Sequence, residues 1–333
     1  MCLALLAVPS TSGAEVKYTL RMATVAPDGT AWAREMRAFS REVLATTGGE
    51  VAIKWYFGGI AGDDLQVQER IRKEQLDGVG SGGMLCERVS PSFRALRVPG
   101  LYESREEVRS VAVQLRPVFE QEFRDNGYAF LGHALLGPIV IASRRPVKTL
   151  ADLKRERMWS WEFDDMTNLP MRAMGLNLVP LSIEAAGAAY TEGKVDGFFG
   201  VPAAMLAYQW SAQAHYVTEV HANYLISCLV TTNRSMDRLP LPHQQALRAA
   251  TAKLSNRLEV VGEEQDRKLM GGLFGRQGLM PVQPADTFRV EFLEAARAAS
   301  ESLGTKLIAP VLMKRVTALV AAYRASHPKT AKN

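Results

Sequence analysis

The sequence has few cysteines and histidines and no long apolar run. No stretch of the mature chain approaches the ~18 uninterrupted apolar residues that a helix needs to cross a bilayer. None of the five histidines stands near another His, a Cys or an acid at a spacing typical of metal sites. They are His133, His215, His221, His243 and His327. We therefore expect neither a membrane span in the mature chain nor a metal site.

Motifs for catalysis and for cofactor binding are also missing. No serine lies in G-x-S-x-G, and no cysteine sits in a recognisable nucleophile context. Gly78, Gly80 and Gly83 match the letters G-x-G-x-x-G, but a predicted helix precedes them and they fall within a predicted strand. Glycines within a strand are better explained by the close approach of a ligand or of the facing lobe to the backbone than by dinucleotide binding. We therefore predict that the protein binds no cofactor and is not an enzyme. A two-lobed enzyme remains the alternative.

The charged residues point to a solvated surface. The net charge of +5 comes from Arg and Lys scattered among acids, whereas a nucleic-acid surface needs basic residues on one face with aromatics between them. We therefore expect no nucleic-acid partner. Asp164 and Asp165 are compatible with a cation site, but such a pair more often forms a solvated turn or caps a helix, and we expect one of these two.

Residues 1–14 carry the evidence for localisation. An apolar run from Leu3 to Val8 precedes Ser12-Gly13-Ala14, a small-residue cleavage site, and this pattern predicts a signal peptide. No basic segment comes first, so the true start lies upstream or the signal is degenerate; an unstructured tail is the alternative. With Cys2 in the signal, Cys86 and Cys228 remain, as one disulfide or as two thiols. We expect the thiols.

The apolar pattern predicts alternating strands and helices. Residues 17–25 and 51–57 alternate as strands, and a helix capped by Thr30 lies between them. A second helix follows from Asp63, and the same rhythm restarts after Arg144. Further on, we expect a strand over residues 224–232, a long helix over 242–271 and helical structure over 288–325. This order is typical of two α/β lobes with parallel strand pairing, which meet near residues 137–145.

The two lobes share a short echo. Residues 75–78 read Gln-Leu-Asp-Gly and residues 194–197 read Lys-Val-Asp-Gly, each turning from a helix into a strand. Ligands of open α/β sheets bind beyond the carboxyl ends of strands. The segments after each echo, 80–84 and 198–202, are therefore predicted to face a shared cleft. The sequence of the second lobe is also rich in aromatic residues. They are interpreted either as part of its hydrophobic core or as residues that face the cleft.

The chain resembles the solute-binding proteins of tripartite ATP-independent periplasmic (TRAP) transporters, the DctP-like family, from about Tyr18 to the C-terminal helix. The resemblance rests on the family's T-G-G, P-A-G-Q-L-G-x-D, D-L-K, G-A-x-P-x-P and V-D-G segments, in the family's order. These five segments lie at residues 47–51, 57–63, 145–154, 175–181 and 192–197, and residues 18–23 resemble the family's opening strand. The resemblance implies a two-lobed periplasmic-binding-protein fold of class α/β, with mixed, mostly parallel sheets, hinge strands and a long helix spanning the lobes.

The resemblance also implies domain limits. Residues 1–14 are the signal peptide, and residues 327–333 form a polar tail. Residues 15–138 with about 228–275 are expected to make lobe I. Residues 139–227 with about 276–326 are expected to make lobe II.

This sequence departs from the family where the ligand binds. The family's arginine after D-L-K, which pairs with a ligand carboxylate, falls on Trp159, and a second polar position falls on or near Ile139. After V-D-G the usual Q-E-N is replaced by Phe198, Phe199 and Gly200. A buried carboxylate without a cation costs several kcal/mol, whereas an aromatic wall suits an apolar surface.

The resemblance and its departures together predict a small hydrophobic or amphipathic ligand. Its predicted contacts are Trp159, Trp161, Phe198, Phe199, Ile139, Met84, Tyr224 and Gly200. The expected partners are integral membrane TRAP permease subunits, and a tetratricopeptide-repeat lipoprotein is a further partner that one branch of the family suggests. Two alternatives remain open: an organic acid held by a substitute cation, Arg157 or Arg144, and a ligand sensor without transport.

Overall fold

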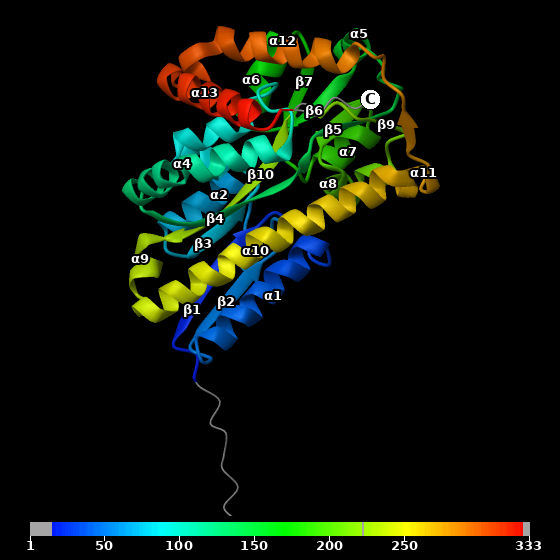
Figure 1. Ribbon diagram of the computed structural model, residues 1–333. Helices are drawn as coiled ribbons and strands as arrows, with labels where there is room; N and C mark the ends of the chain where they lie inside the picture. The colour runs from blue at the N-terminus through cyan, green and yellow to red at the C-terminus, as the bar shows by residue number, and fades with distance from the viewer. Residues whose placement is uncertain (1–14, 222, 329–333) are drawn as a thin grey trace, which may run out of the picture.

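The computed structural model describes residues 15–221 and 223–328, which form two lobes, each built around one β-sheet (Figure 1). The expected signal peptide, residues 1–14, lies outside the described residues, as do residues 329–333 of the polar tail. A search of the described residues finds no helix that is long and apolar enough to cross a membrane.

Lobe I contains a five-stranded sheet in the order β2-β1-β3-β10-β4. β1 is parallel to β2 and β3, whereas β10 is antiparallel to β3 and β4. The strands are β1 (Tyr18–Thr24), β2 (Val51–Tyr56), β3 (Gly78–Ser81), β4 (Tyr128–Pro138) and β10 (Tyr224–Thr232). The predicted strand over residues 224–232 is confirmed at both ends.

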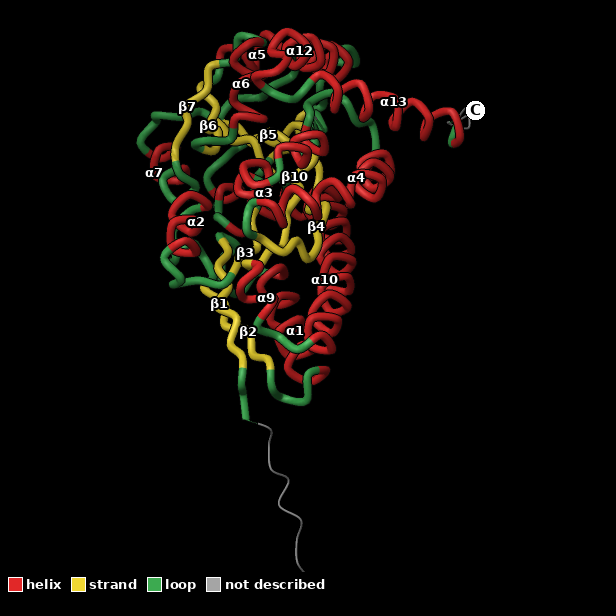
Figure 2. Tube along the Cα trace, turned by 90° about the vertical axis from the view of Figure 1, so that its left-hand side faces the viewer, coloured by secondary structure: helices red, strands yellow, loops and turns green. Residues whose placement is uncertain are grey.

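Helices cover both faces of this sheet. One face carries α1 (Ala31–Thr46) beside the long α10 (Leu241–Lys268), and Figure 2 shows α10 running along α1 and β4. The other face carries α4 (Arg105–Asp125). The remaining helices are α2 (Asp64–Arg72), α3 (Met84–Val89), the 3-10 helix η1 (Pro91–Arg97) and α9 (Asn233–Asp237). The predicted caps are confirmed, since the side chains of Thr30 and Asp63 accept backbone N–H groups of α1 and α2.

Lobe II contains a six-stranded sheet in the order β11-β9-β5-β8-β6-β7. The strands are β5 (Val140–Ser143), β6 (Arg157–Trp161), β7 (Asn177–Leu181), β8 (Gly197–Gly200), β9 (Tyr216–Thr218) and β11 (Met280–Val282). The helices are α5 (Leu150–Arg155), α6 (Asp165–Ala173), α7 (Ala186–Thr191), α8 (Pro202–Ala207), η2 (Trp210–Ala212), η3 (Leu269–Leu273), α11 (Phe274–Arg276) and α12 (Phe288–Leu303).

Two chain segments cross between the sheets side by side. β4 of lobe I passes into β5 of lobe II at Ile139, and β9 returns to β10 through residues 219–223. The backbone N–H of Ile139 donates to the carbonyl of Asn223 at 2.9 Å, so the two crossings are tied together. The helix α10, packed on lobe I, also contacts α8 of lobe II. The predicted two-lobed α/β fold with hinge strands and a spanning helix is confirmed.

The C-terminal region divides between the lobes. The expected helical stretch 288–325 is two helices, because Gly304 adopts a φ of +49° after α12. α12 packs on α6 of lobe II, whereas α13 (Pro310–Ser326) packs on α4 and η1 of lobe I. The exact domain limits stay a prediction. The limit at residue 326 is the one these contacts concern, because α13 falls in the range expected for lobe II and packs on lobe I.

The sequence echo corresponds to a repeated ion pair. In lobe I, Asp77 accepts from the backbone N–H and the Nε of Arg21, at 2.9 and 2.8 Å. In lobe II, Asp196 accepts from the same two groups of Arg157, at 3.0 and 2.9 Å. Each aspartate thus joins the start of its strand to the neighbouring parallel strand, which explains why both lobes carry the same Asp-Gly step.

One expectation about the cysteines is wrong. Cys86 of α3 and Cys228 of β10 form a disulfide, with their Cα atoms 6.0 Å apart. β10 pairs with β3, and the chain turns directly from β3 into α3, so the two side chains meet in the same core cluster of lobe I. The two cysteines are 142 positions apart in the sequence, so no local pattern predicts that they pair.

Candidate ligand-binding site

A cavity of ≈ 90 Å³ lies between the lobes, at the hinge crossings; we call it the interlobe cavity. It is lined mainly by apolar and aromatic side chains from β6, β8, α8 and β10. The lining residues are Arg97, Ile139, Trp159, Ser160, Trp161, Asp164, Thr167, Met171, Ile183, Phe199, Gly200, Val201, Ala204, Trp210, Asn223, Tyr224 and Leu225.

Most of the predicted contact residues meet in this cavity. Six of them line it: Ile139, Trp159, Trp161, Phe199, Gly200 and Tyr224. Phe198 does not, although its cross-strand partner Trp159 does. The Phe198 ring is fully buried between the rings of Tyr190 and Trp210, at centroid distances of 4.9 and 4.7 Å. Met84 is buried at the start of α3 and is absent from the lining of the cavity.

Trp159 lines the interlobe cavity, and its indole N–H already has a hydrogen-bond acceptor within the protein. Its Nε1 donates to the carbonyl of Leu181 at 3.2 Å, and its ring lies 4.8 Å from that of Trp210. Trp159 and Trp161 line the same cavity, as two residues that alternate on one strand should. The position expected to hold a ligand-binding arginine in the family therefore presents an aromatic surface with no free donor.

One cation does line the interlobe cavity, and the sequence analysis missed it. Arg97, at the end of η1, is almost fully buried and pairs with two acids. Its Nη2 donates to Oδ2 of Asp164 at 2.8 Å, across the lobe boundary, and its Nη1 bonds to Glu87 of lobe I. Burial raises the pKa of Glu87 to about 7, against the opposing pull of Arg97. Two acids surround one guanidinium, so the cluster holds no surplus positive charge.

Of the two structural roles expected for Asp164, a solvated turn or a helix cap, the structure shows the cap, together with a second role. Its carboxylate accepts the backbone N–H of Thr167 in the first turn of α6 and also binds Arg97. No pattern in the sequence marks Arg97, because its partners stand ten and 67 positions away along the chain.

The two substitute cations considered from the sequence are engaged elsewhere. Arg157 is bound by both carboxylate oxygens of Asp196, and Arg144 lies over the ring of Tyr190 at 4.2 Å while donating to its carbonyl. Neither arginine lines the interlobe cavity. The described residues also hold no group of three or more His, Cys, Asp or Glu that could bind a metal.

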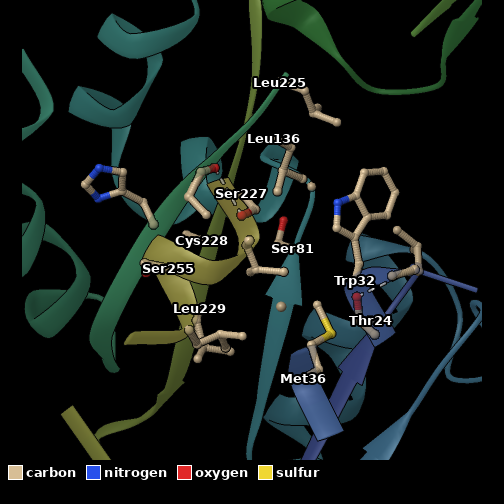
Figure 3. A pocket seen from close by; sticks show the side chains of 18 of the residues that line it. Thr24, Trp32, Met36, Ser81, Leu136, Leu225, Ser227, Cys228, Leu229 and Ser255 are labelled. Carbon is tan, nitrogen blue, oxygen red and sulfur yellow. Dashed lines mark hydrogen bonds between the residues drawn. The ribbon is translucent and has the colours of Figure 1, made fainter. Parts of the chain in front are cut away.

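A second cavity of ≈ 90 Å³ lies between the sheet of lobe I, the helices α1 and α10, and lobe II residues that include Trp161 and Tyr208; we call it the deep cavity. Figure 3 labels ten of its lining residues, among them Trp32 and Met36 of α1 opposite Leu136 of β4 and Leu229 of β10. Four residues line both cavities: Trp161, Ile183, Ala204 and Leu225. The two cavities are therefore neighbours with a common wall.

The lobes are in contact at this wall. A Cβ on Gly82 of lobe I would lie 3.1 Å from the Trp161 ring of lobe II, so only a glycine lets the ring pack there without displacement. The hydroxyl of Tyr208 also donates across the boundary to the carbonyl of Val25, at 2.8 Å. The prediction that the segment after the first echo faces the other lobe is confirmed for Gly82.

Two α/β lobes, joined by paired crossing strands around an apolar cavity, are the architecture of binding proteins whose lobes close on a ligand. The chain belongs to the bacterial extracellular solute-binding proteins of family 7, the DctP family, which matches residues 22–305. These are the solute-binding proteins of TRAP transporters, periplasmic proteins that work with membrane permease components. No curated protein matches the chain.

Several solved TRAP solute-binding proteins share this fold. One from Roseobacter denitrificans, with bound L-galactonate, is 19% identical with a TM-score of 0.83, covering 92% of this chain and 99% of its own. DctP7 of Bordetella pertussis, which binds pyroglutamic acid, is 22% identical with a TM-score of 0.82, covering 91% and 99%. One from Desulfovibrio desulfuricans, with sn-glycerol-3-phosphate, is 16% identical with a TM-score of 0.85, covering 95% and 99%.

Proposed function

We propose that this TRAP solute-binding protein captures a small hydrophobic or amphipathic ligand in the interlobe cavity. The observation that carries the proposal is Trp159, an aromatic side chain with its only donor occupied, where the family resemblance calls for a carboxylate-binding arginine. Ile139, Phe199, Trp161 and Tyr224 continue the same apolar wall. Burying such surface against a ligand contributes about 25 cal/mol per Å².

The charges around the cavity support an apolar ligand over an acid. Each similar structure above holds an anionic molecule, and a buried anion needs a cation or several donors. Arg97 is the only Arg or Lys among the described residues that line either cavity, and Glu87 and Asp164 already pair with it. The organic-acid alternative is favoured by one observation, the Nε of Arg97, which has no partner among the described residues.

Export and the transport partners belong to the same proposal. The disulfide between Cys86 and Cys228 fits an oxidising compartment such as the periplasm, and residues 1–14 would be the export signal. The closed form would be presented to the permease subunits, with a tetratricopeptide-repeat lipoprotein as a further partner. Adjacent permease genes would support transport, whereas an adjacent sensor kinase would support sensing.

A thermal-shift screen tests the ligand class. The protein, freed of bound molecules by unfolding and refolding with its disulfide intact, is screened against sugar acids and dicarboxylates and against lipids and other apolar compounds. We expect the melting temperature to rise with members of the second group only, because binding to the native state stabilises it. Stabilisation by the acids alone would overturn the proposal.

A further inference from the structure

We infer that the deep cavity is a second subsite, which takes the apolar tail of an elongated ligand and binds an uncharged oxygen acceptor on that tail through the indole N–H of Trp32. This inference rests on the proposed function, because the head of the same ligand would occupy the interlobe cavity. The chemical class is an aliphatic molecule with a ketone or ester carbonyl near its inner end.

The unpartnered indole of Trp32 is the first observation. Its side chain is 6% exposed, and its Nε1 has no hydrogen-bond partner among the described residues. Figure 3 shows this nitrogen on the side of the ring that faces Leu136. A buried donor left without a partner costs about 1–3 kcal/mol. An acceptor on a ligand in the deep cavity would remove that cost.

Two of the other four tryptophans that line the cavities donate their indole N–H to a protein acceptor. Trp55 also lines the deep cavity, and its Nε1 donates to the hydroxyl of Ser40 at 2.9 Å. Trp159 lines the interlobe cavity and donates to the carbonyl of Leu181. Trp32 differs from these two because its buried Nε1 has no partner among the described residues, and its side chain lines the deep cavity.

The charges of the deep cavity fix the character of its occupant. Among the described residues, no Lys, Arg, Asp or Glu lines it. Burial lowers the pKa of His133, the one titratable imidazole in the lining, so this ring is neutral at physiological pH. The hydroxyl of Ser81 is already bound to Asp64. An ionised group would find no counter-charge here, so the inner end of the ligand is uncharged.

The size of the cavities requires the ligand to span both. An apolar cavity of about 150 Å³ holds a molecule the size of benzene, and each cavity here measures ≈ 90 Å³. Neither alone holds more than a few heavy atoms in this closed form. Because Trp161 and Leu225 line both, an elongated molecule would pass between these side chains from one cavity to the other.

Calorimetric titration of the ligand-free protein with 2-alkanones of increasing chain length, and with alkenes in which a methylene replaces the carbonyl oxygen, tests this inference. We expect affinity to rise with chain length. Trp32→Phe should weaken alkanone binding about threefold to tenfold, the value of one neutral hydrogen bond, and leave the alkenes unaffected. Trp55→Phe is the matched control, because the donor it removes is already bound to Ser40; it should not discriminate between the two series.

A second variant tests the location. Leu258→Phe adds volume to the deep cavity from α10, and it should weaken the long alkanones while short ones still bind. Two results would overturn this inference but not the proposed function. The first is an equal effect of Trp32→Phe on alkanones and alkenes. The second is an unchanged dependence of affinity on chain length in Leu258→Phe, with a native circular dichroism spectrum. If neither series binds while sugar acids do, the proposed function fails with it.

Discussion

Arg97 and Asp164 form a buried ion pair across the lobe boundary, with Nη2 and Oδ2 2.8 Å apart. Arg97 belongs to lobe I, and Asp164 caps a helix of lobe II, so this bond joins the two lobes directly. Its burial makes it a contributor to closure, because an ion pair excluded from water is little screened by salt.

Asp164→Asn should weaken closure. Asparagine keeps the helix cap but removes the charge that faces Arg97. We expect the free energy of unfolding to fall by about 1.5–3 kcal/mol, the value of a hydrogen bond to a charged group, and ligand affinity to fall as well. Urea unfolding and calorimetry measure the two. Asp165→Asn, at the exposed neighbour, is the control and should change stability by less than about 0.5 kcal/mol.

Glu87 should make stability depend on pH. Burial raises the pKa of its carboxyl from 4.5 to about 7, so the folded protein holds this proton more tightly than the unfolded chain does. The stabilisation is complete below pH 4.5 and is lost as pH rises through about 7. The carboxyl of Asp266, whose pKa burial raises to about 6, acts in the same direction, whereas His133, with its lowered pKa, acts in the opposite one.

The matched variants Glu87→Gln and Asp266→Asn separate these contributions. Melting temperatures measured between pH 4.5 and 8 should fall less steeply in Glu87→Gln than in the unmodified protein. An identical slope in both would show that Glu87 does not titrate in this window.

Removing the disulfide should destabilise lobe I. Loss of a native disulfide typically costs about 2–5 kcal/mol, and the bond between Cys86 and Cys228 closes a loop of more than a hundred residues. We expect the double variant Cys86→Ala/Cys228→Ala to melt at a lower temperature, and the unmodified protein to shift likewise in reductant. Unchanged melting of the reduced protein would contradict the bonded pair.

Gly82 should govern how closely the lobes approach. In Gly82→Leu the new side chain would meet the ring of Trp161, since a Cβ alone already lies 3.1 Å from it. We expect weaker ligand binding and a smaller decrease in the radius of gyration on ligand addition, measured by small-angle X-ray scattering. Gly275→Ala, where a Cβ has open space, is the control and should bind as the unmodified protein does.

Local pattern was enough to predict most of the fold. Strands β1 and β10 and the caps at Thr30 and Asp63 follow from alternation and side-chain chemistry within a few residues. Trp159 and Trp161 line one cavity because alternate residues of a strand share a face. The same rule does not explain why Phe199 lines it and Phe198 does not, because Phe198 lies opposite Trp159 on the neighbouring strand.

What the sequence did not predict depends on residues that are distant in the chain. The cluster of Arg97, Glu87 and Asp164 and the disulfide join separate helices and strands, and no local pattern records such a meeting. The deep cavity draws its lining from α1, α10 and all five strands of lobe I, so no one segment marks it. Such features arise from packing, which the periodicity of single elements does not determine.

Native mass spectrometry of the protein as purified, followed by extraction of any bound molecule, tests the central claim most directly. We predict a bound molecule that dissociates on unfolding and partitions into organic solvent, as the aromatic wall around Trp159 requires. A bound hydrophilic acid that stays in the aqueous phase, such as a sugar acid, would contradict the account.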